Sequence, residues 1–438
     1  MSYLIILTSW KVFMKKNILI ILLSVVVVVA VIIFVAVLLS KETSITVATY
    51  GLSETEASVI KELCIKQMPE KYTLKFIALN GNKSLHDEII ANKKIDVVFS
   101  ENGLALEKAK YLFKKFDVEL FQKLPSVFLN AGNWTNIAYV DKPANNESAS
   151  EGNVQNARLK DANLYAYPIY FTVPELLVKK RFYPLAERTS FTSKESIDEM
   201  LKTLKTKFPY PLVLQGSKDE VLSFLVSALL TEYGVDYTSD DFIALQKEID
   251  FHKHLPNELR QVLQTLVSWK MSGFLHTQWY DLTETDLQTF LEFDQSPVAF
   301  LTVDAQMKMN RDLMENYIQK NVLLTTSLAA SNIPARMIFI SQVEKKQNAK
   351  LADISNAILS YFQSVDAQKE IFAKLNFPAV EYNANVTFAA STAAGWIYAA
   401  NSIIPTIDKI LFETVAQRKK FIDEIRNYIG QNGFGYNE

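Results

Sequence analysis

The sequence is poor in the residues that build disulfides, metal sites and phosphate-binding loops. It contains one cysteine, four histidines and twelve glycines in 438 residues. One cysteine excludes an intrachain disulfide framework, and Cys64 lies in a helical pattern where a small buried hydrophobic residue is expected. The histidines have neither HExxH nor zinc-finger spacing, and no G-x-S-x-G elbow, glycine-rich phosphate loop or Cys-His spacing is present. We therefore expect no catalysis, no cofactor and no bound metal.

A strong charge of one sign is also absent. Lysine and arginine number 46 against 48 for aspartate and glutamate, which gives a formal net charge of −2. The only charged residues before residue 41 are Lys11, Lys15 and Lys16, so the remainder carries −5. A mildly acidic body argues against nucleic acid as a partner.

One long apolar run dominates the N-terminal region. Residues 18–39 contain a single polar side chain, Ser24, and a helix of that length reaches about 33 Å, enough to cross a hydrocarbon core of about 30 Å. No A-x-A cleavage site follows, and the lysines precede the run. We predict a transmembrane signal anchor over 18–39 in the cytoplasmic membrane, with residues 1–17 cytoplasmic and the body facing the periplasm or the cell exterior. A cleaved signal peptide is the alternative, and the motif MKKNILI makes Met14 an alternative start.

Beyond the apolar run the chain alternates between strand and helix periodicities. A β-branched run at 45–50 ends at Gly51 and precedes a helix that begins with a capping box formed by Ser53 and Glu56. The segments YTLKFIAL and IDVVF supply further strands. Strands that alternate with helices predict a mostly parallel α/β sheet, in which ligands lie beyond the carboxyl ends of the strands. Those ends are expected at 50–53, 79–82 and 100–103.

Several longer segments occur in an order that is known from one family. They are ITVATYGLSETEASVIKELC, DVVF, YAYPIYFTVPELLVKKRF, SFTSKESIDEMLKTLK, SPVAFLTVDAQ and LADISNAILSYFQSVDAQKEIFAKLNFPAV. In order and spacing they resemble extracellular solute-binding proteins of family 1, the sugar-binding group of ABC importers that includes maltose-binding protein. The resemblance covers residues 45 to about 430, and no single motif in it is specific.

The resemblance implies a type II periplasmic-binding-protein fold, in which two α/β lobes are joined by a hinge and enclose a cleft. Carried over to this chain, lobe one combines 45–166 with 301–335, and lobe two combines 167–300 with 336–438. The crossovers between the lobes are expected near 166–170, 297–302 and 334–340. The implied function is capture of a small solute, with a carbohydrate favoured, and its delivery to the permease subunits of an ABC importer.

Candidate ligand-binding residues follow from what a sugar site requires. Such a site combines flat apolar faces with groups that hydrogen-bond hydroxyls. The aromatic candidates are Tyr50, Tyr170, Trp279, Tyr280 and Trp396. The polar candidates, in loops at strand ends, are Ser53, Glu54, Asn80, Asn82, Glu101 and Asn102. Core packing and solvated loops are the alternative explanations, and the strand VAFLTVDAQ lacks the Gly-x-Trp that follows it in many relatives.

Two other functions remain open. The first is an anchored sensor or scaffold module that keeps the binding fold but signals to a separate partner, because a stub of at most 17 residues cannot hold an output domain. The second is a degenerate homologue whose cleft binds nothing. A neighbouring permease gene would favour transport, whereas a neighbouring histidine kinase or chemoreceptor gene would favour sensing.

Overall fold

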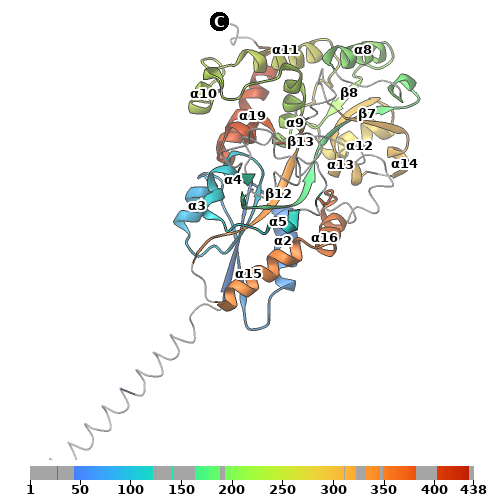
Figure 1. Cartoon of the computed structure of the whole chain (residues 1–438). Helices are drawn as coiled ribbons and strands as arrows, with labels where there is room; N and C mark the ends of the chain where they lie inside the picture. Colours follow the sequence, from blue (N-terminus) through green and yellow to red (C-terminus); the bar gives the residue numbers. More distant parts are fainter. Residues whose placement is uncertain are drawn as a thin grey trace, which may run out of the picture.

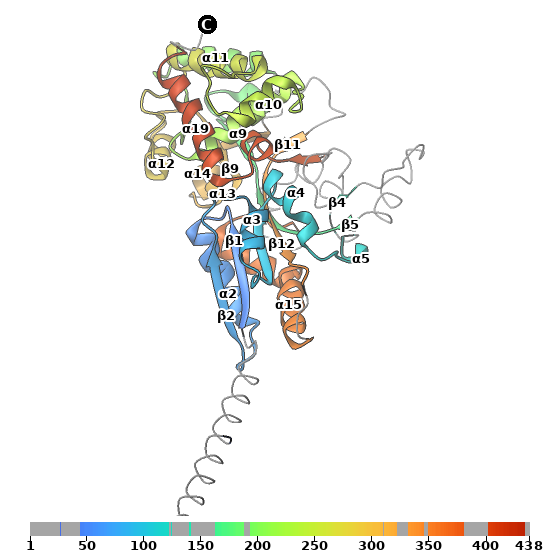
Figure 2. The ribbon, with the colours of Figure 1, turned by 90° about the vertical axis from the view of Figure 1, so that its left-hand side faces the viewer.

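The computed structural model describes residues 27, 44–121, 124, 140–141, 163–187, 193–309, 311–321, 332–345, 349–380 and 402–433. These residues form two bodies, each built on a β-sheet with helices around it, that are stacked along the long axis of the molecule (Figure 1 and Figure 2). The predicted anchor at 18–39 lies outside the described residues except at position 27. Among the described residues, no helix is both long enough and apolar enough to cross a membrane.

The first sheet has the strand order β2-β1-β3-β12-β6. Its strands are β1 (Ser44–Tyr50), β2 (Thr73–Ala78), β3 (Val97–Glu101), β6 (Tyr167–Thr172) and β12 (Arg336–Gln342). β1 pairs in parallel with β2 and β3, whereas β12 is antiparallel to both β3 and β6. Parallel pairing needs a crossover that returns the chain to the same end of the sheet. β12 runs in the opposite direction to both of its neighbours, so the sheet is mixed rather than mostly parallel.

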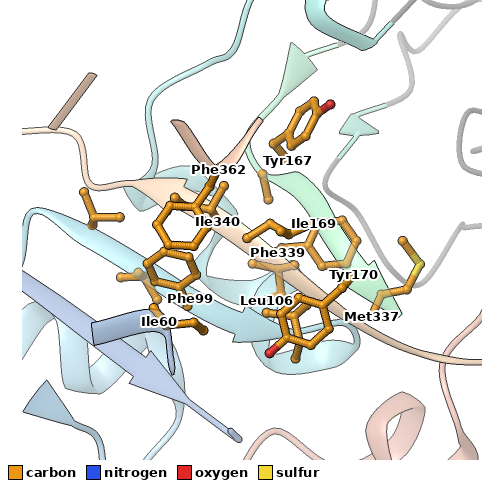
Figure 3. Close-up of a cluster of buried hydrophobic side chains, with 14 of the residues drawn as sticks. Ile60, Phe99, Leu106, Tyr167, Ile169, Tyr170, Met337, Phe339, Ile340 and Phe362 are labelled. Carbon is orange, nitrogen blue, oxygen red and sulfur yellow. The ribbon is translucent and has the colours of Figure 1, made fainter. Parts of the chain in front are cut away.

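Helices cover the first sheet on both faces. They are α2 (Glu54–Lys66), α3 (Leu85–Ala91), α4 (Leu104–Ala109), α5 (Val118–Phe121), α15 (Ala349–Phe362) and α16 (Val365–Leu375), with the 3-10 turn η1 (Lys110–Leu112). The predicted capping box is confirmed, because Ser53 and Glu56 exchange hydrogen bonds at the start of α2. Figure 3 shows side chains of α2, α4 and α15 meeting those of β3, β6 and β12 in one core, where Phe99 and Phe362 pack edge to face at 4.8 Å.

The second sheet has the order β10-β7-β9-β8. Its strands are β7 (Pro174–Lys179), β8 (Leu212–Leu214), β9 (Val298–Thr302) and β10 (Tyr317–Asn321). Around it lie α8 (Lys194–Lys205), α9 (Asp219–Leu230), α10 (Asp240–Lys247), α11 (Asn257–Met271), α12 (Glu284–Glu292), α13 (Val303–Met307), α14 (Arg311–Met314), α18 (Ile407–Leu411) and α19 (Val415–Gly430). The turns η3 (Pro184–Glu187) and η4 (Thr231–Tyr233) complete this body. Two small sheets pair β4 (Val140–Asp141) with β5 (Asn163–Leu164) and β11 (Asn332–Pro334) with β13 (Ser402–Ile404).

Sheet membership divides the chain differently from the predicted lobes. The chain passes from β6 in the first sheet to β7 in the second through Val173, just beyond the crossover expected at 166–170. β12, α15 and α16 belong to the first sheet and its core, although 336–438 is predicted for lobe two. β10 pairs with β7 of the second sheet, although 301–335 is predicted for lobe one. An apolar face in the sequence indicates that an element is buried, but it does not identify the sheet that covers it.

Candidate functional site

A cavity of about 790 Å³ lies between the two bodies. Its first wall consists of residues that follow the carboxyl ends of β1, β2 and β3, among them Ser53, Asn80 and Glu101. The second wall comes from the amino end of α9, which follows β8, and from α13, which follows β9. Residues of α18, of α19 and of the end of α16 complete the lining. The cavity therefore lies where strand ends of both sheets converge, as expected for ligand sites in α/β proteins.

A buried arginine holds the first wall together. Arg336, at the start of β12, donates through Nη1 to Glu56 Oε1 at 2.7 Å and through Nη2 to Glu56 Oε2 at 2.9 Å. Its Nε donates to Glu101 Oε1 at 2.5 Å, and its Nη2 also reaches the carbonyl oxygen of Gly51 at 3.3 Å. Burial raises the pKa of Glu56, but the ion pair with Arg336 outweighs it, so the net effect lowers the pKa. The side chains of Arg336, Glu56 and Glu101 thus form the charged floor of the cavity and are joined by hydrogen bonds.

A second arginine reaches this floor from the other body. Arg418 on α19 donates through Nη1 to Glu101 Oε2 at 2.9 Å and through Nε to the carbonyl oxygen of Phe412 at 3.1 Å. Its third nitrogen, Nη2, is buried and has no hydrogen-bond partner among the described residues. Glu101 therefore bridges two arginines that belong to different bodies.

Glu220, at the start of α9, is a cavity carboxylate whose pKa is raised. Its Oε1 lies 3.6 Å from Arg336 Nε and is buried without a hydrogen bond among the described residues. Burial is the main cause that raises its pKa from the ordinary value of 4.5 to about 7, and Asp304 and Glu56 add to the rise, while Arg336 and Lys409 oppose it. Near neutral pH this side chain is consequently about half protonated.

Two further carboxylates of the cavity lining accept hydrogen bonds from hydroxyl groups. Asp304 accepts a hydrogen bond of 2.5 Å from Thr172 at the end of β6, which links the two bodies. Asp408 accepts hydrogen bonds from Thr406, at 2.5 Å, and from Ser223. Burial raises the pKa of Asp408, but Lys409 and the other cationic and hydroxyl neighbours lower it overall. Both carboxylates therefore have hydrogen-bond donors within the protein.

The two bodies touch closely beside the cavity. The hydroxyl of Tyr50 lies within hydrogen-bond distance of the carbonyl oxygens of Lys83, at 3.0 Å, and Glu413, at 2.8 Å, and its single proton can be donated to either. Gly103 has a φ of 118°, and a Cβ built on it would lie 2.6 Å from the carbonyl oxygen of Lys409. Only glycine accommodates both this backbone conformation and this approach. The contact between α4 and α18 therefore requires the absence of a side chain at position 103.

Three of the predicted ligand-binding residues lie in the cavity lining, namely Ser53, Asn80 and Glu101. Ser53 caps α2, the side-chain oxygen of Asn80 accepts from the backbone N–H of Asn82, and Glu101 binds the two arginines. Each of them is thus partly engaged by the protein itself. Contact of these three with a solute stays a prediction.

Seven other predicted residues are described and are not part of the cavity lining. Asn102 is fully buried and binds the backbone of Ala335 and Met337, and the hydroxyl of Tyr170 donates to Glu56 at 2.9 Å within the first core. Trp279 is buried in the second core, and Tyr280 is exposed beside it. Tyr50, Glu54 and Asn82 are likewise not part of the lining. Trp396 lies outside the described residues.

Sequence reasoning missed the charged centre of the cavity. Arg336, Arg418, Glu220, Asp304 and Lys409 all line it, and none of them was a candidate. One signal was available, because Arg336 directly precedes an apolar run and Asp304 directly follows one. A charge beside a buried strand requires a partner, although the sequence does not name that partner. Among the described residues, no group of histidine, cysteine and acidic side chains is placed to hold a metal ion.

No family model and no curated protein sequence matches the chain. Solved structures do match it over about nine tenths of its length. A bacterial solute receptor, AcbH, described as having an exclusive preference for β-D-galactopyranose, is 14% identical with a TM-score of 0.59, over 90% of this chain and 94% of that one. A sugar transporter from Bacillus licheniformis in complex with stachyose is 11% identical with a TM-score of 0.60, over 90% and 98%. A chitin oligosaccharide binding protein is 14% identical with a TM-score of 0.54, over 89% and 98%. The chain therefore has the mixed α/β fold of periplasmic solute-binding proteins.

Proposed function

We propose that the protein is a membrane-anchored receptor of an ABC importer that captures a small solute between its two bodies and delivers it to a permease. The observation that carries this proposal is the cavity of about 790 Å³ between the bodies, with both contributing walls. Its volume falls within the range of about 300 to 1,000 Å³ that is typical of small-molecule sites. The solved structures with the same fold are named for galactopyranose, stachyose and chitin oligosaccharides, which supports a carbohydrate as the ligand.

The two bodies give the proposed receptor a means of responding to its ligand. The chain passes between the bodies at Val173, again between β10 and β12, and again between α16 and α18. Side-chain contacts such as those of Glu101 with Arg418 and Thr172 with Asp304 also link them. A solute that contacts both walls favours the arrangement in which the walls are close, because only that arrangement supplies all of its contacts. The permease would recognise this closed form.

The apolar run at 18–39 is proposed to hold the receptor beside its permease. The first strand begins at Ser44, so about 15 to 18 Å of extended chain separates it from the run. Confinement next to the permease raises the effective concentration of the receptor there. The carboxylates of the cavity serve binding rather than catalysis in this proposal, because Glu56, Glu101 and Asp408 are already bound by arginine or hydroxyl groups.

Closure of the bodies on a ligand can be measured directly. Ile65 on α2 and Met271 on α11 are exposed and belong to different bodies, and the native Cys64 is fully buried. Spin labels on cysteines at 65 and 271 of the full-length protein in mild detergent should move closer when a bound sugar or oligosaccharide is added. A saturating ligand at about 100 times its Kd should also raise stability by about 2.7 kcal/mol. If a panel of mono- and oligosaccharides changes neither the distance nor the stability, the proposal is wrong, and a degenerate homologue becomes the better description.

A further inference from the structure

We propose that the solute of this cavity is an anionic polyol, namely a sugar that carries a carboxylate or phosphate group. This inference rests on the proposed function and specifies the ligand class of the same site. The observation that carries it is the buried guanidinium of Arg418 in the cavity wall, whose Nη2 has no hydrogen-bond partner among the described residues.

The two cavity arginines differ in how many of their side-chain nitrogens are hydrogen-bonded. Every side-chain nitrogen of Arg336 has a partner, because Glu56, Glu101 and the carbonyl of Gly51 accept from it. Arg418 binds Glu101 and the carbonyl of Phe412 through Nη1 and Nε only. A buried guanidinium nitrogen without an acceptor is costly, and an anionic acceptor compensates this cost better than a neutral hydroxyl. The unused donor of Arg418 is therefore suited to a carboxylate or phosphate oxygen.

Among the described residues, aromatic surface is scarce in the cavity lining. Phe377 is the sole aromatic residue among the described lining residues. Its ring is stacked on Tyr170 with centroids 5.2 Å apart, and the guanidinium of Arg336 lies 5.9 Å from its centre. Neutral sugars obtain much of their affinity by placing C–H faces on flat apolar rings. In this part of the cavity, recognition therefore has to depend more on polar and charged groups.

The lining carries charges of both signs, and most of them have partners within the protein. The described lining contains seven lysines and arginines and six carboxylates. Glu56 and Glu101 are neutralised by the two arginines, and Asp219 pairs with Arg426, which lies outside the lining, at 2.6 Å. Lys218 and Lys308 pair with Glu284, and Lys374 pairs with Glu62. Asp304 and Asp408 accept from hydroxyl groups. Among the described residues, Lys409 and Lys419 are the two lining lysines that form no salt bridge within 4.0 Å. Lys409 is buried, and its ammonium group donates a hydrogen bond of 3.4 Å to Thr406 Oγ1. Lys419 is exposed on α19.

Glu220 complements an anionic ligand instead of repelling it. Burial raises its pKa to about 7, so at or below neutral pH it carries at most about half a charge. Its unpaired Oε1 can accept a hydrogen bond from a ligand hydroxyl. A sugar acid offers both groups that the cavity lacks, an anionic acceptor for Arg418 and hydroxyl donors for Glu220.

Calorimetric titration of the full-length protein in mild detergent tests this inference. The probes are D-glucuronate, D-galacturonate and glucose 6-phosphate, with glucose, galactose and maltose as uncharged controls and L-alanine as a zwitterionic one. We expect one of the anionic sugars to bind at least about tenfold more tightly than its uncharged parent, which is the effect of one charged hydrogen bond. Its affinity should fall as salt is raised from 50 to 500 mM, because salt screens the lysines. The uronates and the sugar phosphate decide which anionic group is preferred.

Adjacent lysines of α19 supply a matched pair of variants. Lys419 lines the cavity and Lys420 does not, although both are exposed and carry the same charge. Lys419→Gln should weaken binding of the anionic sugar about two- to fivefold, whereas Lys420→Gln should leave it unchanged. Arg418→Lys keeps the charge but removes the planar set of guanidinium donors, so we expect its affinity for the anionic sugar to fall about 10- to 100-fold. The unfolding midpoint of this variant is measured separately to show that it folds.

The outcomes separate this inference from the proposed function. If an uncharged sugar binds as tightly as its anionic counterpart, or if the two lysine variants behave alike, the inference is wrong and the receptor proposal stands. Tighter binding of L-alanine than of any sugar overturns the inference in the same way. If no probe of any class binds, the receptor proposal falls together with it.

Discussion

Replacing Glu220 by glutamine should remove a loss of stability that the wild-type protein undergoes as the pH rises. In the folded protein the pKa of Glu220 is raised from 4.5 to about 7, chiefly by burial. A carboxyl group with a raised pKa binds its proton more tightly in the folded than in the unfolded state. Its contribution is therefore complete below about pH 4.5 and is lost as the pH rises through 7.

The magnitude follows from the two pKa values. Integrating proton release between pH 5 and pH 8 gives a decrease of about 2.5 kcal/mol in the free energy of unfolding. About a third of the side chain is reached by solvent, its exposed fraction being 31%. Solvent screens part of the effect, so we expect about 2 kcal/mol. The glutamine variant has no proton to release and should lose this component entirely.

Chemical denaturation of the full-length protein at pH 5, 6, 7 and 8, followed by tryptophan fluorescence, measures the difference. Glu199→Gln is the control, because it removes the same charge from an exposed position on α8. Subtraction of the two profiles cancels the four histidines and the acidic groups with lowered pKa, such as Glu56 and Asp408. Equal pH dependence of Glu220→Gln and wild type would refute the raised pKa that burial gives this carboxyl group.

Four further predictions concern ion pairing, packing and accessibility. Arg336→Met leaves two buried glutamates without their shared cation, so we expect a loss of about 3 to 5 kcal/mol in the free energy of unfolding by urea titration, and a loss below about 1 kcal/mol would contradict the charged floor. A Cβ at Gly216 would lie 2.1 Å from a ring carbon of Trp279, so Gly216→Ala should cost about 1 to 3 kcal/mol and alter tryptophan emission. A Cβ at Gly430 meets nothing within 4 Å, so Gly430→Ala in α19 should instead raise the free energy of unfolding, by up to about 1 kcal/mol. Cys64 is fully buried and burial raises its pKa, so a thiol reagent should label it only after unfolding, and labelling of the native protein would show that α2 opens.

Local signals in the sequence located the elements of the first body well. The β-branched run at 45–50 is strand β1, and the capping box of Ser53 and Glu56 begins α2 where it was expected. The edge formed by the carboxyl ends of β1, β2 and β3 was also predicted, and it forms one wall of the cavity. These features depend on residues within a few positions of one another, so a single sequence contains them.

The chemistry of the cavity was decided by partners that are far apart in the chain. Glu56 was interpreted as a capping residue, but its carboxylate also binds Arg336, which is 280 positions away, and Glu101 binds Arg418 at a separation of 317. Tyr170 was expected at the ligand and instead donates to Glu56 within the core. The sequence by itself determined which segments form strands and helices and where the strand ends lie, because short-range hydrogen bonds and periodic apolar faces decide these. Only the tertiary structure decided which charges neutralise one another and which donor remains unpaired, because ion pairing depends on distances between residues that the chain order does not specify.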